Sequence, residues 1–409
     1  MAKVPFKTAD ILLPQNADMT KWSVVACDQY TSEPKYWDHV KNTVGTSPST
    51  FNMIFPEIYL EDDDADIRIK NINETMEKYL KDGVFKTLNN SLIYVERSVL
   101  CGKIRRGIVG SVDLEHYDYN KGSTSLIRAT EGTVLERIPP RVKVRINASV
   151  ELPHIMLLID DEKDIVFNAI NKDTSPVYDF DLMCNSGHIR GYKIDGEPVI
   201  NALTELYNKL DGDNKLLFAV GDGNHSLATA KECWEQIKKG LTQQQMLTHP
   251  ARFPLVEIVN IHDSSLEFEP IHRVVFGCNS KHLLDSLKEY YKECNNDGVG
   301  QKITFVINGN KEDIYIGDPS SQLTVGTLQN FLDAYIKDNN CKIDYIHGED
   351  VVLELTKETN TIGFLLPPMG KSELFPTVIK DGSLPRKTFS MGEAWEKRFY
   401  LECKMIKQV

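Results

Sequence analysis

The pattern of apolar and polar positions predicts a strand, a turn and a helix within one short stretch. The apolar run Leu216–Val220 is typical of a buried strand. Beyond a Gly-Asp-Gly turn, apolar residues recur at helical spacing from Leu227 to Ile237, and Gly240 follows where a helix C-cap is expected. Polar side chains therefore gather at the joint between strand and helix: Asp222, Asn224, His225 and Ser226.

The same patterns elsewhere predict an α+β protein in three parts. Strands, turns and amphipathic helices alternate through residues 1–278, which we expect to form the main core. Residues 279–380 then show a helix, an Asn-Gly hairpin, a second helix and further strands, which together predict a smaller C-terminal α+β module. Residues 381–409 form a basic, aromatic tail that we expect to pack back on the core.

Composition narrows the class of protein. A formal charge of −12 makes nucleic-acid binding unlikely, and no apolar run is long enough for a membrane span. The N-terminal residues lack the pattern of a secretory signal, and the eight cysteines are scattered without a C-x-x-C pair. We therefore expect reduced thiols, no structural zinc and a cytoplasmic location.

The joint at residues 221–226 suits phosphate. First-turn N–H groups of a helix have no intrahelical partner, and the helix dipole adds partial positive charge there. Glycines let the backbone approach a ligand closely. The spacing matches neither the Walker loop nor the dinucleotide fingerprint. The structural alternative is that Asn and Ser cap the helix while Asp-Gly simply makes a turn.

A basic stretch supplies a second candidate segment. From residue 128 to 145 there are five basic residues (Arg128, Arg137, Arg141, Lys143, Arg145) against two acidic ones, Glu131 and Glu136. The last three basic residues alternate, and Pro139–Pro140 disfavours a helix interior, so we expect an extended chain with one cationic face. Such a row holds phosphate or carboxylate oxygens, or is a solvated strand face. Glu131 and Thr133 lie on a glycine-containing turn in this stretch.

Two smaller groups extend the candidate site. His272 and Arg273 are adjacent at the end of the predicted core. In the tail, Arg386 and Lys387 either reach an anion in the main cleft or belong to an element that packs on the core.

Four segments in chain order carry a resemblance to a known family. Residues 128–133, 221–226, 270–273 and 384–388 together resemble the domain-of-unknown-function family ten-fifteen. Most members have Asp-Gly-His-His-Arg where this chain has Asp222-Gly-Asn-His-Ser226. That commoner loop resembles the phosphate-site loop of ParB/sulfiredoxin-like free-serine kinases, which convert L-serine to O-phosphoserine. Asn224 and Ser226 thus replace an imidazole and a guanidinium.

The resemblance implies a ParB/sulfiredoxin-like mixed α/β core and a small-molecule kinase acting on L-serine. Donor phosphate from ATP, ADP or pyrophosphate would lie at the turn, where Gly223, Asn224 and Ser226 line it and His225 donates a hydrogen bond. Asp222 would bind Mg²⁺ and Glu131 would act as the base. Arg128, Arg137, Arg141 and Arg145 would stabilise transferring oxygens or bind a carboxylate.

Two other functions use the same residues. The transfer can run in reverse as a phosphoserine phosphatase or phosphotransferase, or the chain can be a ParB-like nucleotide-dependent binding protein. All three functions require that the arginine-lined segment 128–145 and the glycine-flanked segment 221–226 meet around one anion. Oligomeric state does not follow from the sequence.

Overall fold

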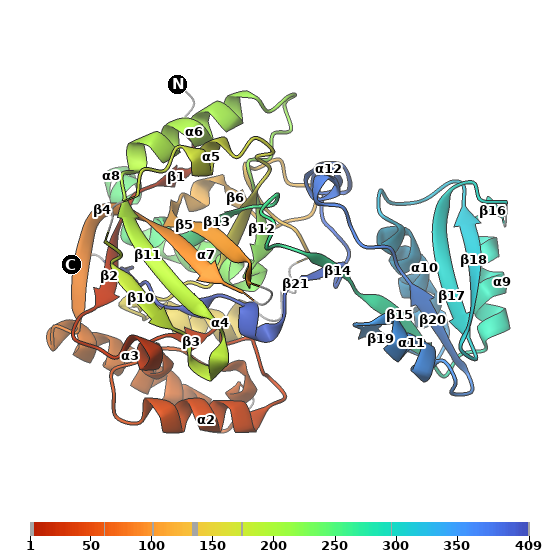
Figure 1. Cartoon of the computed structure of the whole chain (residues 1–409), viewed down its shortest axis with the longest axis horizontal. Helices are drawn as coiled ribbons and strands as arrows, with labels where there is room; N and C mark the ends of the chain where they lie inside the picture. Colours follow the sequence, from red (N-terminus) through yellow and green to blue (C-terminus); the bar gives the residue numbers. More distant parts are fainter. Residues whose placement is uncertain are drawn as a thin grey trace. The chain divides into compact units, whose positions relative to one another are not determined.

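The computed structural model describes residues 4–60, 62–99, 102–132, 138–172, 175–295 and 297–407, and it divides into two compact units. The first unit comprises residues 1–266 together with 393–409, and the second comprises residues 267–392. The ribbon in Figure 1 shows a large sheet with helices in the first unit and a smaller sheet with helices in the second. The expected mixed α/β fold is confirmed.

Among the described residues of the first unit, eleven strands form one mixed sheet. Its order is β10-β11-β4-β5-β13-β9-β12-β7-β6, with β1 beside β5 and β2 beside β4. The strands are β1 (Phe6–Lys7), β2 (Ala9–Pro14), β4 (Phe85–Ser98), β5 (Ile104–Val112), β6 (Tyr117–Asp118), β7 (Ile127–Ala129), β9 (Met156–Ile159), β10 (Tyr178–Asp181), β11 (His188–Ile194), β12 (Phe218–Asp222) and β13 (Leu255–Asn260). Two short ribbons pair β3 (Val24–Val25) with β22 (Phe399–Tyr400) and β8 (Val150–Glu151) with β23 (Lys404–Met405).

Strand β4 shows how the sheet separates two cores. Leu92 and Tyr94 belong to one buried cluster, whereas Ile93 and Val95 belong to another. This alternation follows from the period of two in a strand, which sends successive side chains to opposite faces. Helices cover both faces (Figure 1): α1 (Met19–Trp22), α2 (Pro34–Val44), α3 (Ala65–Lys81), α4 (Ile138–Arg145), α5 (Ile165–Asn168), α6 (Gly196–Asn208), α7 (Asn224–Ile237) and α8 (Gln243–Thr248).

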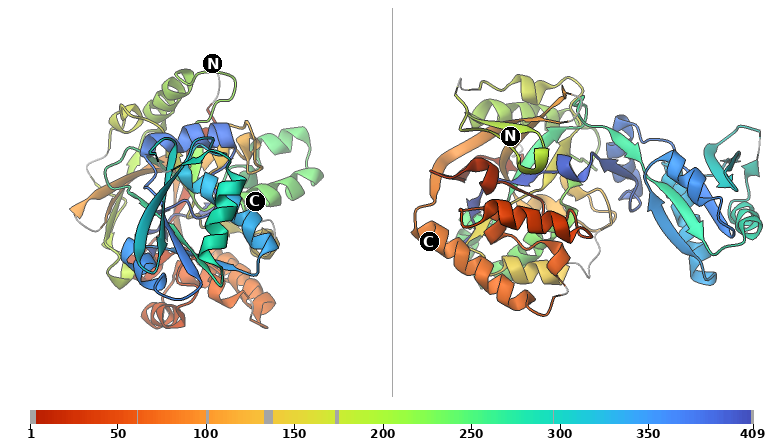
Figure 2. Two further views of the ribbon diagram at one scale, coloured as in Figure 1. Left: turned by 90° about the vertical axis from the view of Figure 1, so that its right-hand side faces the viewer. Right: turned by 60° about the horizontal axis from the view of Figure 1, so that its bottom comes forward.

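The second unit is built on a six-stranded antiparallel sheet, coloured teal to blue in Figure 2. Its order is β16-β18-β17-β20-β15-β19, and a separate ribbon pairs β14 with β21. The strands are β14 (Phe268–Pro270), β15 (His272–Phe276), β16 (Cys294–Asn295), β17 (Gln301–Ile307), β18 (Asn310–Ile316), β19 (Lys342–Ile346), β20 (Thr361–Leu365) and β21 (Phe389–Met391). The helices are α9 (Ser280–Tyr290), α10 (Thr324–Asp338), α11 (Glu349–Leu355) and α12 (Leu374–Asp381).

The boundaries between the units differ from those expected at residues 278 and 380. Strand β15 pairs with both β20 and β19, so it belongs to the second sheet rather than to the core. Strand β14 pairs with β21, which brings the first part of the predicted tail into the second unit as well. Only residues 393–409 return to the first unit.

A buried ionic network fixes this returning segment. The Arg398 guanidinium donates to Glu257 Oε2 at 2.6 Å and to Glu402 Oε2 at 2.7 Å, and it also reaches the carbonyl of Pro153 at 2.8 Å. Tyr178 donates to the other oxygen of Glu402 at 2.6 Å. The three charged side chains are at most 5% exposed. Because both carboxylates are buried away from solvent, each depends on the arginine for its compensating charge.

Replacing Arg398 with methionine tests this anchor. Because Glu257 and Glu402 would stay buried without their cation, we expect a loss of about 3–5 kcal/mol in the free energy of unfolding. All four tryptophans lie in the first unit, so tryptophan fluorescence in urea follows that unit. Arg190→Met is the control, since Arg190 is 48% exposed beside Asp179 and should cost less than about 1 kcal/mol. Equal stability of the two variants would contradict the anchoring role.

Candidate functional site

The two candidate segments of the sequence lie side by side at one edge of the sheet. Strands β7 and β12 pair in parallel, with Ala129 opposite Val220. Beyond the last pair, Thr130 Oγ1 donates to the Val220 carbonyl at 2.6 Å, and Thr130 N donates to Asn224 Oδ1 at 3.2 Å. Hydrogen bonds therefore join the ends of the two strands, and one of them is accepted by the side-chain amide oxygen of Asn224.

The predicted strand, turn and helix are confirmed at residues 218–237. Gly223 is in the left-handed conformation, with φ of 79°, and Asp222 Oδ1 accepts a hydrogen bond from its N–H at 2.8 Å. Helix α7 starts at Asn224, and residues such as Leu227 and Trp234 bury one of its faces. The N–H groups of its first turn have no intrahelical acceptor, so this end of α7 favours an anion.

A buried histidine connects three elements beside this helix end. His154, which precedes β9, is 4% exposed. Its Nδ1 lies 2.8 Å from the Tyr400 hydroxyl, and its Nε2 lies 3.3 Å from Ser226 Oγ. The carboxylate of Asp28 is 3.9 Å from the same Nε2. Burial raises the pKa of Asp28, but the combined effect of His154, Gln29 and Lys397 lowers it by more than burial raises it. The net shift of this pKa is therefore downward, and the carboxyl is ionised at neutral pH.

Lys397 brings a cation to the same place from the returning C-terminal segment. Its Nζ lies 3.5 Å from Asp222 Oδ2, and the two side chains are only 16% and 17% exposed. It is also one of the charges that lower the pKa of Asp28. Arg97 holds the segment by donating to the carbonyls of Lys397 and Trp395. The site therefore has a Lys397–Asp222 ion pair next to the positive end of α7, and the charge of the same ammonium group also acts on Asp28.

Residues 138–145 are helical, so the predicted extended chain with one cationic face is wrong. The two prolines lie in the first turn of α4, where a proline removes no helical hydrogen bond. On a helix Arg141 and Arg145 share a face, and they pair with Glu57 and Glu151. Lys143 points elsewhere, is 68% exposed and lies 3.7 Å from Asp66.

Arg128 is a structural clamp in this fold and not a residue of the turn. Its buried guanidinium donates to the carbonyls of Ser125 and Lys215, both at 2.7 Å, and to Asn214 Oδ1 at 2.6 Å. Because β7 and β12 run parallel, residues 214 and 215 lie at the ends of these strands opposite to Asp222. The structure therefore places the Arg128 guanidinium at the strand ends away from the turn, and its contacts do not support the predicted role in stabilising transferring oxygens or binding a carboxylate.

The other predicted residues of these segments have different outcomes. Glu131 lies directly beyond the end of β7 and is half-buried, as is His225 in the first turn of α7. The His225 carbonyl accepts a hydrogen bond from Thr229 at 2.7 Å. Thr133 and Arg137 lie outside the described residues.

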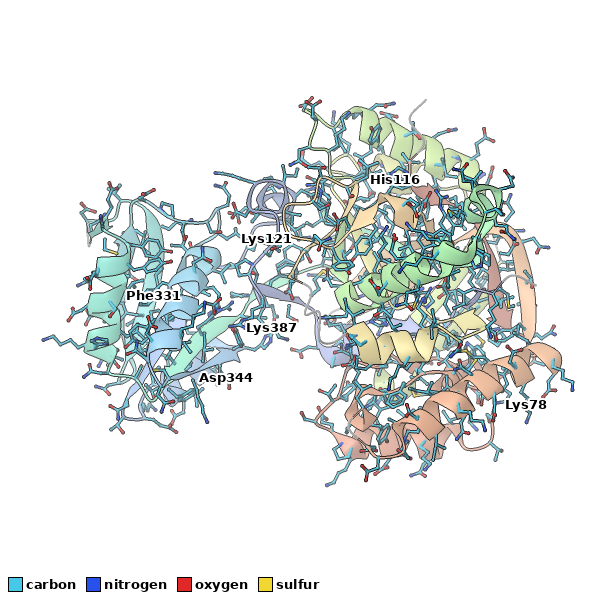
Figure 3. All side chains as sticks on the ribbon, turned by 180° about the vertical axis from the view of Figure 1, so that it is seen from behind. Lys78, His116, Lys121, Phe331, Asp344 and Lys387 are labelled. Carbon is cyan, nitrogen blue, oxygen red and sulfur yellow. The ribbon has the colours of Figure 1, made fainter. Side chains whose placement is uncertain are left out.

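The remaining predicted site residues belong to the second unit and contact other residues of that unit: His272, Arg273, Arg386 and Lys387. Arg273 is fully buried and donates to the carbonyls of Arg386 and Lys387, both at 2.9 Å. Nδ1 of His272 accepts from the Leu366 N–H at 3.1 Å, and burial lowers the pKa of this imidazole. Arg386 pairs with Asp333 at 3.0 Å, and Lys387 is labelled in Figure 3. Arg273 and His272 thus stabilise their own unit rather than provide an open phosphate site.

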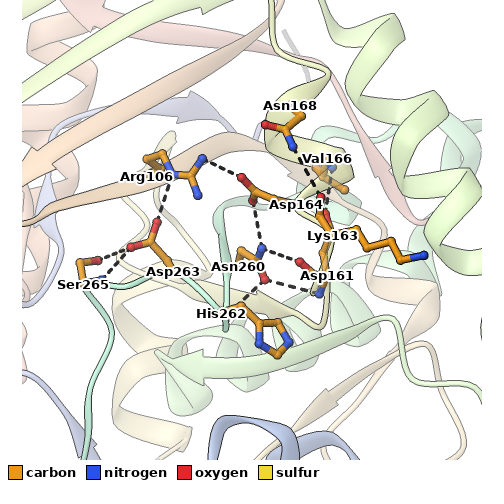
Figure 4. Close-up of polar contacts among 10 residues, drawn as sticks. All are labelled: Arg106, Asp161, Lys163, Asp164, Val166, Asn168, Asn260, His262, Asp263 and Ser265. Atoms are coloured by element: carbon orange, nitrogen blue, oxygen red, sulfur yellow. Dashed lines mark hydrogen bonds and ion pairs between the residues drawn. The ribbon is translucent and has the colours of Figure 1, made fainter.

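A second polar cluster lies where the parallel strands β9 and β13 end, and Figure 4 shows its contacts. Arg106 pairs with Asp164 at 2.9 Å and with Asp263 at 3.2 Å. Asn260 Nδ2 donates to the Asp161 carbonyl at 2.8 Å and to Asp164 Oδ1 at 3.1 Å. These groups satisfy one another and tie the loop after β9 to the end of β13, so the cluster is structural.

Within the residues that the structure describes, no group of three or more His, Cys, Asp or Glu side chains is arranged to hold a metal ion. In the same part of the chain, no helix has both the length and the apolar character needed to cross a bilayer.

Fold and site define a mixed α/β protein with an anion-favouring helix start at the joined ends of two parallel strands. Residues 5–335 match the family described as "Protein of unknown function (DUF1015)", and the chain belongs to that family. No curated protein matches it.

Three solved structures illustrate distant likeness. A free serine kinase in complex with AMP is 11% identical, with a TM-score of 0.38, over 73% of this chain and 90% of that one. A free serine kinase variant in complex with ADP is 11% identical, with a TM-score of 0.39, over 75% of this chain and 93% of that one. SbnI from Staphylococcus aureus, with a C-terminal truncation, is 10% identical, with a TM-score of 0.37, over 69% of this chain and 83% of that one.

Gly223 can be tested directly. A methyl group there would lie 3.0 Å from Ile155 Cα, and an alanine in left-handed backbone costs about 1–2 kcal/mol. We therefore expect Gly223→Ala to lose at least that much unfolding free energy in urea. Gly240→Ala is the control, because its methyl would meet no heavy atom within 4 Å. Equal stability of the two variants would show that the turn tolerates a side chain.

Proposed function

We propose that the protein is a small-molecule phosphotransferase that moves a phosphoryl group from ATP, ADP or pyrophosphate to the hydroxyl of a free amino acid, with L-serine as the simplest acceptor. The observation that carries this proposal is the position of Lys397 beside Asp222 at the N-terminus of α7. A fixed cation, a helix start and carboxylates are the groups that phosphoryl transfer requires.

The donor phosphate binds at the start of α7. The N–H groups of residues 224–226 face it, and Gly223 lets the backbone approach closely. The ammonium group of Lys397 neutralises charge on the transferring oxygens. Arg128 has no part in this role, because its guanidinium is engaged at the far ends of β7 and β12.

Two carboxylates are candidates for the base that accepts the acceptor's hydroxyl proton. Glu131 lies just beyond the end of β7, and Asp28 lies beside His154. A base must be ionised before the transfer, and Asp28 meets this condition because its pKa is lowered. Comparing Glu131→Gln with Asp28→Asn in the assay below assigns the role to the residue whose loss costs more.

Magnesium fits this donor set. Mg²⁺ is usually held by one or two carboxylates together with substrate phosphates and water, rather than by a complete protein cage. Asp222 would provide such a carboxylate, and Asp28, on which the charge of Lys397 also acts, is a candidate for a second one. When bound, the ion would neutralise phosphate charge during transfer.

The activity assay uses the full chain with L-serine and each of the three donors in turn, and O-phosphoserine is measured. We expect product with at least one donor, and a fall of roughly 10²–10³-fold in kcat for Asp222→Asn. Asp211→Asn is the matched control, because Asp211 is exposed in the loop before β12. If no donor gives a phosphorylated amino acid, the proposal fails.

The pH dependence of the reaction tests Lys397. This lysine helps to lower the pKa of Asp28, so in Lys397→Met that pKa rises towards its ordinary value. If Asp28 must be ionised, activity is then lost at a higher pH on the acidic side. We expect the acidic limb of the kcat profile to move upward in pH, with a lower plateau. Lys70→Met, altered at a side chain that is 75% exposed, should leave the profile unchanged. An unmoved limb in Lys397→Met would contradict the coupling.

A further inference from the structure

A cavity of about 140 Å³ lies beside the candidate site in the first unit. Ser226 and His154, which contact each other, both line it. Its other walls come from α3, α4, residues 53–60 and residues 148–155, together with Cys27, Thr229 and Tyr400. Ser226 belongs to the first turn of α7, where the donor phosphate would bind, and His154 lies beside the base candidate Asp28, so an acceptor bound in this cavity would lie next to both groups.

The cavity has an apolar part and a polar part. Its apolar walls include Met53, Phe55, Met76, Ala148 and Val150, all members of one buried hydrophobic cluster. Its polar lining includes Glu57, Arg141, His154, Ser226 and Tyr400. An occupant that matches both parts is amphipathic, because polar groups placed against the apolar walls would lose their hydrogen bonds.

The Glu57–Arg141 pair indicates which polar groups the occupant has. The pair connects the 3₁₀ helix at Glu57–Tyr59 to α4, and each side chain is 16% exposed. Burial raises the pKa of Glu57 even though Arg141 opposes the shift, so this pair is poorly solvated. An α-amino acid brings one carboxylate for Arg141 and one ammonium for Glu57 without adding net charge.

We infer that the acceptor is a β-hydroxy-α-amino acid with an apolar side chain larger than that of serine. The inference rests on the proposed function. An engineered apolar cavity of about 150 Å³ accepts benzene. Here the ammonium and carboxylate groups take up part of a space of similar size, and the remaining apolar part accommodates a side chain of a few carbons. The single methylene of serine covers little of the apolar walls.

The transfer balances for this acceptor as for serine. The acceptor's β-hydroxyl oxygen forms a bond to the terminal phosphorus of the donor, and the bond from that phosphorus to the bridging oxygen breaks. The hydroxyl proton passes to the carboxylate base. The donor leaves as its shortened form, which is ADP when the donor is ATP.

The first experiment compares kcat/KM for L-serine, 3-hydroxyleucine and 3-phenylserine with the same donor. Each buried methylene contributes about 0.8 kcal/mol, or about fourfold, so the three additional carbons of 3-hydroxyleucine should raise kcat/KM by roughly 50-fold over serine. Ala148→Leu places its side chain in the cavity and should reduce this ratio at least tenfold. Val144→Leu adds one methylene to the same lining and serves if the first variant does not fold. Ala65→Leu, half-buried on α3 outside the lining, should keep the ratio.

The second experiment separates this inference from the proposed function. Thermal shift of the full chain is measured with each amino acid and no donor, so that binding is detected without turnover. A larger shift with 3-hydroxyleucine than with serine, lost in the cavity-filling variant, supports the preference of the cavity for the larger side chain, and this result does not depend on formation of a phosphorylated product. Phosphorylation of serine at equal or higher kcat/KM than the larger acids overturns it and leaves the proposed function standing. Equal thermal shifts for all three acids also overturn it.

Discussion

The buried guanidinium of Arg398 determines whether the candidate site exists. It neutralises Glu257 from the centre of the sheet and Glu402 from its own segment, where neither carboxylate is more than 5% exposed. The same segment carries Lys397 and Tyr400, which provide the cation beside Asp222 and the hydroxyl on His154. Lys397 and Tyr400 lie more than 170 residues beyond the turn at 221–223 in the sequence. The Arg398 network therefore places two groups of the site that come from a distant part of the chain.

The charges of the site suit an anionic ligand that binds together with a divalent cation. Asp28 and Asp222 lie near one ammonium group, and burial alone would favour the neutral form of such carboxyls. His154, Gln29 and Lys397 keep Asp28 ionised. A bound phosphate adds negative charge here, and the N-terminus of α7, Lys397 and a divalent cation are the means of compensating it. The carboxylates are thus placed for binding a cation and accepting a proton, and the helix start for binding the phosphate.

The elements that depend on local residue spacing could be predicted from the sequence. The strand, turn and helix at 218–237 follow from an apolar run, a glycine turn and helical periodicity, and all three are present. Residues 127–130 lie directly beside this strand and turn, whereas the expected meeting of the two segments around a shared anion stays a prediction. By contrast, Pro139–Pro140 is compatible with both the start of a helix and an extended chain. The alternating basic residues led to the prediction of an extended chain, whereas the segment is helical.

The remaining differences arise from tertiary contacts that no local pattern encodes. Arg128 and Arg273 appeared as candidate phosphate ligands, but each is buried and bonded to backbone carbonyls. Asp28, His154 and Lys397 were missed because they are far apart in the chain and have no shared periodicity. Of the three, only Asp28 has a local signal, because it begins an irregular polar and aromatic stretch at residues 28–37, a composition typical of a loop that lines a site.

The most direct test is a crystal structure of the full chain grown with pyrophosphate and Mg²⁺. The account predicts phosphate oxygens within hydrogen-bond distance of the backbone N–H groups of residues 224–226, with Lys397 on the same anion. Pyrophosphate bound elsewhere, with the start of α7 occupied only by water, would contradict it.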